Sequence, residues 1–299
     1  MTFVFFMRHV YSRWLQDYCM LVASGVVVAL NCVVLWRHFR RHLTTTYYGM
    51  LFMLMATNVV YGIMNTVIST IMVLPASVKG FLFDGSDKAL HLMSLTPHIA
   101  QQMVSLSGVF LALDRILILA VGTKYAFWNV SLKLSICAGI TNTVTVLVFY
   151  CFICIPKEIP DLSTPQYVFK TFIFTPTLIA EVVLYAIFLF LYRNYSKTTK
   201  KPKEQTAANN RIFIFQMILN IALCVTPNAL TAVRKINHHW AAFRWAGNIE
   251  PFYNVFFAAF VLLVSFFSLY FLRSKKKVVK IASALNNGFG TPRSTHRST

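Results

Sequence analysis

Charged residues are scarce in this sequence, and acidic residues are the scarcest among them. Only 12% of its 299 residues are charged and nine are Asp or Glu, whereas 57% are hydrophobic. A soluble domain carries about 25% charged residues, because polar side chains must cover its surface. The composition therefore excludes a water-soluble globular protein.

The sequence also lacks the residue patterns of enzymes and metal sites. No CxxC pair lies in a solvated loop, and His238 and His239 are adjacent, which places them poorly for joint chelation. No nucleophile paired with a base is apparent within the long hydrophobic segments of the sequence. We therefore expect no enzyme activity, metal site or cofactor. Cys19 and Cys154 lie near outer helix ends, and the sequence leaves open whether they form a disulfide.

Hydrophobic residues come in blocks of about twenty, the length at which an α-helix crosses the hydrocarbon core of a bilayer. Strands of a membrane barrel would instead alternate apolar and polar residues. We therefore expect an all-α bundle of seven transmembrane helices. The expected spans are 18–36, 47–74, 95–120, 133–155, 168–192, 212–233 and 247–272. They leave residues 1–17 as an extracellular tail without a cleaved signal peptide, and residues 273–299 as a basic tail.

Basic residues account for the formal net charge of +19, and their positions predict the orientation of the chain. They concentrate in alternate connections, above all in residues 193–211 and in the tail after residue 273. The positive-inside rule places that side in the cytoplasm and the N-terminus outside. The lipid bilayer thus explains the charge, and no nucleic-acid partner is expected.

Asp114 and Arg115 stand at the expected cytoplasmic end of the third span. A carboxylate beside a guanidinium offsets part of the cost of burying either charge. The pair is either an ion pair that reaches toward the lipid headgroups or part of a functional switch. The residues alone leave both interpretations open.

The triplet Asp114-Arg115-Ile116 resembles the Asp/Glu-Arg-Tyr triplet that ends the third helix of rhodopsin-like G-protein-coupled receptors. Three further segments resemble motifs of the first, second and sixth helices of that family: Asn31 with Val34, Ala56-Thr57-Asn58 and Cys224-Val225-Thr226-Pro227. The sequence also departs from the family in three places. The seventh span keeps only Tyr270 of the Asn-Pro-x-x-Tyr motif. The third span begins without a cysteine, and the fourth span has no tryptophan. The resemblance implies a divergent receptor in which Arg115 takes part in the switch between inactive and active states.

Short loops, phenylalanine-rich spans and the segments 111–118 and 131–135 resemble the nematode serpentine chemoreceptors, class BC in particular. This resemblance implies a plasma-membrane receptor in the cilia of sensory neurons. It would detect an environmental small molecule, as in olfaction, and signal to a heterotrimeric G protein. The expected coupling and switch residues are Asp114, Arg115, Pro227, Lys197, Lys200, Lys201 and Lys203.

Pro227 lies within the sixth span, where it removes a backbone hydrogen bond and kinks the helix. Asn228 beside it can bond to a freed carbonyl. The kink is either static or a hinge that lets the cytoplasmic half of the helix swing.

Polar residues in the outer halves of the spans form a candidate ligand site of the mostly apolar kind found between helices. His98, Gln101 and Gln102 share one helical face. The expected ligand-binding residues are His98, Gln101, Gln102, Thr175, Asn228, Glu250, Tyr253 and Asn254. Each one taken singly is better explained by a hydrogen bond between helices, and only their convergence predicts a site.

Glu181 lies within the fifth span, where a bare carboxylate is costly, so we expect it to face the interior of the bundle. It is either a protonated, hydrogen-bonded group with Asn220 as a structural partner or a directly functional residue.

A multi-span secondary transporter of a small solute is the alternative from another functional class. It would predict an internal repeat and interrupted helices that meet near the midplane of the membrane. No convincing repeat is present, and seven spans do not divide into equal halves.

Overall fold

A computed structural model describes residues 2–41, 45–75, 77–78, 87–122, 124–154, 174–198, 204–230 and 252–273. Seven helices within these ranges are long and apolar enough to cross a membrane. The same ranges contain helices and no strand. The expected all-α class and the expected count of seven spans are therefore confirmed for this part of the chain, and the protein is a multi-pass membrane protein.

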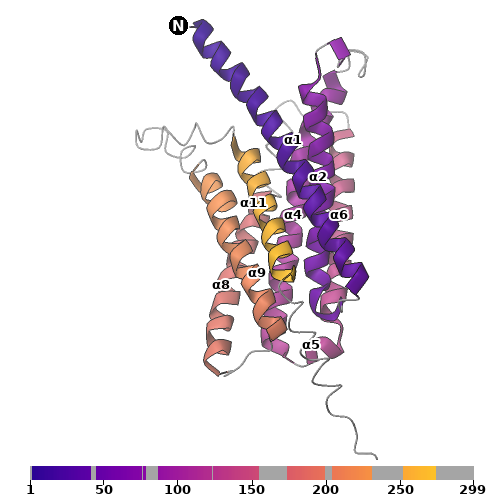
Figure 1. Ribbon diagram of the computed structural model, residues 1–299, viewed down its shortest axis with the longest axis vertical. Coiled ribbons are helices and arrows are strands. Elements are labelled where there is room, and N and C mark those ends of the chain that lie inside the picture. The colour runs from indigo at the N-terminus through magenta and orange to yellow at the C-terminus, as the bar shows by residue number, and fades with distance from the viewer. Residues whose placement is uncertain are drawn as a thin grey trace, which may run out of the picture.

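The helices follow one another as shown in Figure 1. Their bounds are α1 (Thr2–Arg41), α2 (Thr45–Val73), α4 (Asp87–Val121), α5 (Lys124–Phe127), α6 (Val130–Cys154), α8 (Thr175–Thr198), α9 (Glu204–Asn220) and α11 (Tyr253–Arg273). A π-helical segment, η2 (Ile221–Val225), continues α9, and the chain stays helical to residue 230.

Helix lengths differ from the expected spans mainly at α1 and α8. Residues 2–17, expected as a tail, are helical and continuous with the first span, which runs from Leu15 to Arg40. The fifth span extends to Lys197, five residues beyond the expected end at residue 192. Pro176 occupies the first turn of α8, where a missing N–H costs no helical hydrogen bond. The second and third spans lie within one residue of the expected bounds.

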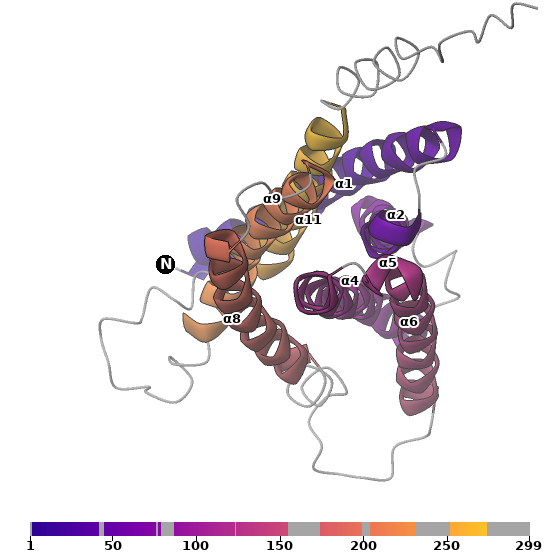
Figure 2. The same ribbon diagram turned by 90° about the horizontal axis from the view of Figure 1, so that it is seen from below.

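Helix α4 lies at the centre of the bundle. It packs against α2, α6 and α8, while α1 packs against α2 and α11, and α9 packs against α11. Seen along the bundle, α2 and α6 lie on one side of α4 and α8 lies on the other (Figure 2). Side chains of α4 therefore reach most of the bundle.

Side chains are distributed as expected for a protein surrounded by lipid. Large apolar residues such as Ile140, Phe190 and Phe266 are exposed on the outer surface. Polar residues such as Asn58 and Gln102 are buried inside. Within a bilayer, polar groups gain hydrogen bonds only from other helices, which favours the interior for them.

Candidate functional site

Polar side chains gather at two ends of the bundle and in its middle. We name the two ends after residues of α4. The Arg115 end is the one at which α5 lies, and the Gln101 end is the opposite one (Figure 1).

A glycine turn builds the Arg115 end. Gly122 follows the last residue of α4 with φ of 61°, the left-handed conformation that glycine adopts readily at helix C-termini. Its N–H donates to the carbonyl of Ile118 at 3.2 Å, and its own carbonyl accepts from the N–H of Tyr125 at 3.3 Å. The turn thus folds α5 back against the end of α4 and brings Tyr125 to Asp114.

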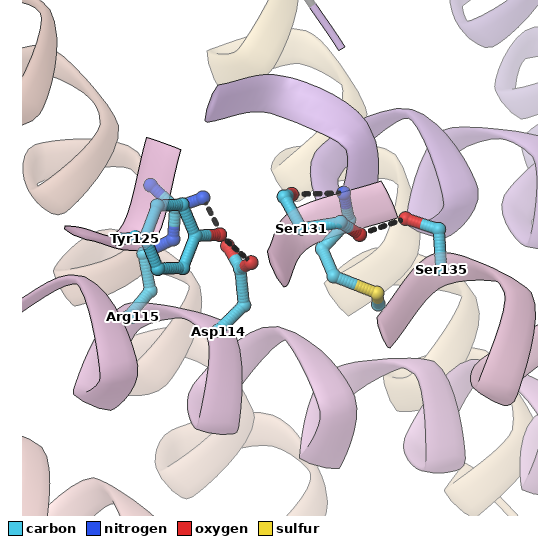
Figure 3. Close-up of polar contacts among 6 residues, drawn as sticks. Asp114, Arg115, Tyr125, Ser131 and Ser135 are labelled. Carbon is cyan, nitrogen blue, oxygen red and sulfur yellow. Dashed lines mark hydrogen bonds and ion pairs between the residues drawn. The ribbon is translucent and has the colours of Figure 1, made fainter. Parts of the chain in front are cut away.

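Asp114, Arg115 and Tyr125 form a buried triad (Figure 3). The Arg115 guanidinium donates to Oδ2 of Asp114 and pairs with it, while the Tyr125 hydroxyl donates to Oδ1. The exposed fractions of the Asp114 and Arg115 side chains are 0% and 2%. Each carboxylate oxygen therefore has a donor, which offsets the cost of burying the charge.

Tyr125 remains a neutral donor in this triad. Burial raises the pKa of its phenol, and the neighbouring Asp114 carboxylate raises it further. Nothing in the spacing of the sequence singles Tyr125 out, because its contact depends on the turn at Gly122.

Ser131 ties the same end to α2 and α6. Its hydroxyl accepts a hydrogen bond from the Met50 N–H at 3.1 Å, and its carbonyl accepts one from the Ser135 hydroxyl at 2.7 Å (Figure 3). A Cβ atom added at Gly49 would lie 3.1 Å from the Ser131 Oγ, so glycine permits the close approach of α2 to α6. Helices α2, α4, α5 and α6 are thus joined around the triad.

Arg115 also borders the later helices. A small cavity is lined by Arg115 together with Leu51, Leu111, Ile212 and Phe213, which come from α2, α4 and α9. A shift of α9 away from α4 would therefore widen the space beside the guanidinium.

At the Gln101 end, two neighbouring glutamines of α4 contact different helices. Gln101 donates to Oδ1 of Asn254 on α11 at 2.9 Å, and Gln102 donates to the Thr177 hydroxyl on α8 at 2.8 Å. Three of these four residues are expected ligand-binding residues. The expected Thr175 is exposed, whereas Thr177, about 200° further round the helix, faces α4.

The other expected ligand-binding residues lie around this pair of contacts. His98 is half-buried, one turn before Gln102 on α4. Tyr253 is buried at the start of α11, with its ring edge-on to Phe174 at 6.2 Å. The Asn228 amide donates to the carbonyl of Cys224 at 2.9 Å, one turn earlier in the same helix and not the carbonyl four residues before Pro227. Glu250 lies outside the described residues.

Of the expected coupling residues, Lys197 is exposed in the last turn of α8 and Pro227 is buried. Lys200, Lys201 and Lys203 lie outside the described residues. The helix before Pro227 is π-helical over Ile221–Val225. The regular α-helical backbone is therefore interrupted by a wider π-helical turn as well as by the proline. Such a segment is a common place for a helix to bend.

Glu181 occupies the middle of the bundle. It is buried, and its Oε1 accepts a hydrogen bond from the Tyr185 hydroxyl. The amide of Asn220 on α9 donates to that hydroxyl at 3.0 Å, so the expected partner is joined to Glu181 through Tyr185. This chain of contacts connects α8 to α9.

Neither a protein-family model nor a curated protein matches this chain.

Proposed function

We propose that this protein is a chemosensory receptor that signals to a heterotrimeric G protein. An environmental small molecule binds among the outer halves of α4, α8 and α11, and the helices repack so that Arg115 becomes accessible to the G protein. No catalysis is required, because a ligand shifts the balance between two arrangements through its different affinities for them.

The observation that carries the proposal is the position of the Asp114–Arg115–Tyr125 triad. Arg115 is fully buried, has its charge matched by Asp114, and borders the cavity beside Ile212 and Phe213 of α9. An arginine held in this way can be released by movement of one neighbouring helix. The backbone of that helix changes to the π form at η2, a suitable place for such a movement.

A cytoplasmic location of the Arg115 end is part of the proposal. Exposed basic residues around that end support it: Arg40, Lys124, Lys133, Arg193, Lys197 and Arg211. Lys and Arg collect on the cytoplasmic side of membrane proteins and attract acidic partners there.

The ligand site is proposed at the Gln101 end. Gln101 and Gln102 hold α11 and α8 against α4 through single hydrogen bonds between neutral side chains. A ligand that exchanges these bonds for its own can move either helix at little cost, since such a bond is worth roughly 0.6 kcal/mol.

A reporter assay in cells tests the proposal. Cells that express the full chain are exposed to a panel of volatile and water-soluble compounds, and second-messenger change is recorded. We expect Arg115→Ala to abolish any response of the wild type at equal surface expression. Arg193→Ala, an exposed arginine at the same end, should leave the response largely unchanged. Ligand-dependent solute flux without G-protein activation would instead identify a transporter.

A further inference from the structure

Glu181 is the buried acidic group that the proposed switch does not use. Its side chain is 1% exposed, and it lies six residues after Thr175, the start of the fifth span. Asp114, the other buried acid among the described residues, has Arg115 beside it. No ion pair involving Glu181 occurs within the described ranges.

The carboxyl group fits a slot in α4. Gly108 has no side chain there, and a Cβ atom added to it would collide with Oε1 of Glu181. On the other side, Tyr185 donates to the same oxygen and Asn220 of α9 donates to Tyr185. Oε2 has no hydrogen-bond partner among the described residues. The group is thus enclosed by α4, α8 and α9 without a compensating charge.

The titratable neighbours of Glu181 are neutral side chains. They are Tyr185 on α8, Cys224 on η2 and Tyr253 on α11. Tyr61 of α2 lies near Cys224 and Tyr253. Tyrosine and cysteine ordinarily titrate near pH 10 and 8.5, above the pH of most surroundings. Glu181 is therefore the member of this cluster whose charge can change below the range in which tyrosine and cysteine titrate.

An ionised carboxylate enclosed in this way would be strongly unfavourable, because it is buried and no described side chain supplies a cation to it. A proton on the carboxyl group removes the charge. If α9 and η2 move from α8, the contact from Asn220 to Tyr185 breaks and water can reach the acid. The O–H bond then breaks, the proton passes to water and the carboxylate remains.

We propose that Glu181 is a proton-binding site whose occupancy is coupled to the movement of α9 and η2 in the proposed receptor. The closed arrangement holds the proton and the open arrangement releases it. Acidification therefore stabilises the closed arrangement, and a rise in pH favours the open one. If each opening releases one proton, the ratio of open to closed protein changes by up to about tenfold per pH unit. This holds at pH values at which the carboxyl group is protonated in the closed arrangement and ionised in the open one.

Infrared spectroscopy tests the proton site without reference to signalling. The full chain is purified into lipid nanodiscs, and the carbonyl band of protonated carboxylic acids is recorded at neutral pH. We expect the wild type to show such a band and Glu181→Gln to lose it. Asp17→Asn, which removes a partly exposed acid near the start of the first membrane span, should keep it. A wild-type spectrum without the band, or a band unchanged in Glu181→Gln, would overturn the proposal.

Tyr185→Phe provides a second variant should Glu181→Gln fold poorly. It keeps the acid and removes the donor to Oε1. The acid band should then shift toward the position of a more weakly hydrogen-bonded carbonyl. An unshifted band would show that the protonated acid is a different residue.

Basal G-protein signalling measured across external pH tests the coupling. The wild type should signal more as pH rises, by up to about tenfold per unit, while Glu181→Gln stays low and flat. Equal pH profiles for the two proteins would refute the coupling and leave the receptor function standing. An acid band lost in Glu181→Gln, together with a chain that never activates a G protein, would refute the receptor function and leave the proton site.

Discussion

Helices α1, α4 and α6 pack against α2 and, for α6, against α4, with glycines and hydroxyl groups at these contacts, whereas the rings of α9 pack against rings of α8 and α11. The first group is α1, α2, α4 and α6, and the second is α8, α9 and α11. We call these groups the N-terminal half and the C-terminal half. In the first, a Cβ atom at Gly62 would lie 2.6 Å from Val28, and Ser107 bonds to both Thr57 and Asn142 at 3.0 Å. Closely approaching backbones with fixed hydrogen bonds permit one arrangement.

The C-terminal half combines aromatic contacts with an interrupted helix. The ring of Phe213 on α9 meets Tyr185 and Phe188 of α8 edge-on, at centroid distances of 5.5 and 4.7 Å. Aromatic pairs remain favourable over a range of centroid distances and tilts. The π-helical η2 and Pro227 interrupt the regular backbone in the same half. In the proposed receptor, the first half is the fixed part of the switch and the second half is the moving part.

The two halves meet along α4 and also where α1 packs against α11. From one end to the other, Gln101 and Gln102 contact α11 and α8, Gly108 receives Glu181, and Arg115 borders α9. The proposed ligand, proton and G-protein sites all lie on this boundary. Changes on either side of it should therefore have different consequences.

Asp114→Ala should produce the largest effect, because it leaves the Arg115 guanidinium buried without its partner. Breaking a buried pair in this way costs about 3–5 kcal/mol. Thermal unfolding of the purified chain in nanodiscs should show a clear loss of stability, whereas Arg193→Ala, which removes an exposed charge at the same end, should change little. Equal unfolding temperatures for the two variants would show that the pair contributes nothing to the bundle.

Gly62→Ala should have the next largest effect and should act within the N-terminal half. The new methyl group would push α1 from α2, at a cost of about 1–3 kcal/mol. Gly25→Ala is the matched control, since nothing lies within 4 Å of a Cβ atom at that position. The same unfolding assay compares them, and an equal loss in both would contradict the tight packing of α1 on α2.

Tyr125→Phe should cost about 1–2 kcal/mol, because it removes the donor to Oδ1 of Asp114 and leaves a buried acceptor unpaired. Tyr270→Phe, on the outward surface of α11, should be neutral. In the receptor proposal, the weakened triad also raises basal signalling in the reporter assay. Unchanged stability together with unchanged basal signalling would show that Tyr125 does not hold the triad.

Thr177→Val should have the smallest effect, about 0.6 kcal/mol, because it removes one neutral hydrogen bond between α8 and α4. Ile179→Val, on the outward surface of the same helix, should have almost none. A double-mutant cycle of Thr177→Val with Gln102→Leu isolates the pair in unfolding experiments. Additive effects of the two substitutions would contradict the contact.

The seven spans could be predicted from the sequence because the length of an apolar block reflects the thickness of the membrane. The second span, expected at 47–74, runs from Tyr48 to Val73. Block length carries no information about helix outside the membrane, so the extension of α1 to Thr2 was not predictable. It also does not fix which side of a helix faces inward, so the sequence cannot distinguish Thr177, which faces α4, from Thr175, which is exposed.

The candidate site could be predicted only where a residue is unusual for its depth in the membrane. Asp114, Arg115 and Glu181 stand out as charges within apolar blocks. Tyr125 and Gly108 are ordinary residues whose importance comes from the turn at Gly122 and from the packing of α8 on α4. Roles for Glu250, Lys200, Lys201 and Lys203 remain predictions.

Spin-label distances across and within the halves test the division of the bundle most directly. Labels are placed on exposed positions near the Arg115 end, in a background with the native cysteines replaced: Arg211 on α9, Leu132 on α6 and Phe39 on α1. Asp114→Asn, which weakens the triad, should lengthen or broaden the distance from 211 to 132. The distance from 39 to 132, within the N-terminal half, should stay the same. An unchanged first distance, or an equal change in both, would contradict a C-terminal half that moves against a fixed N-terminal half.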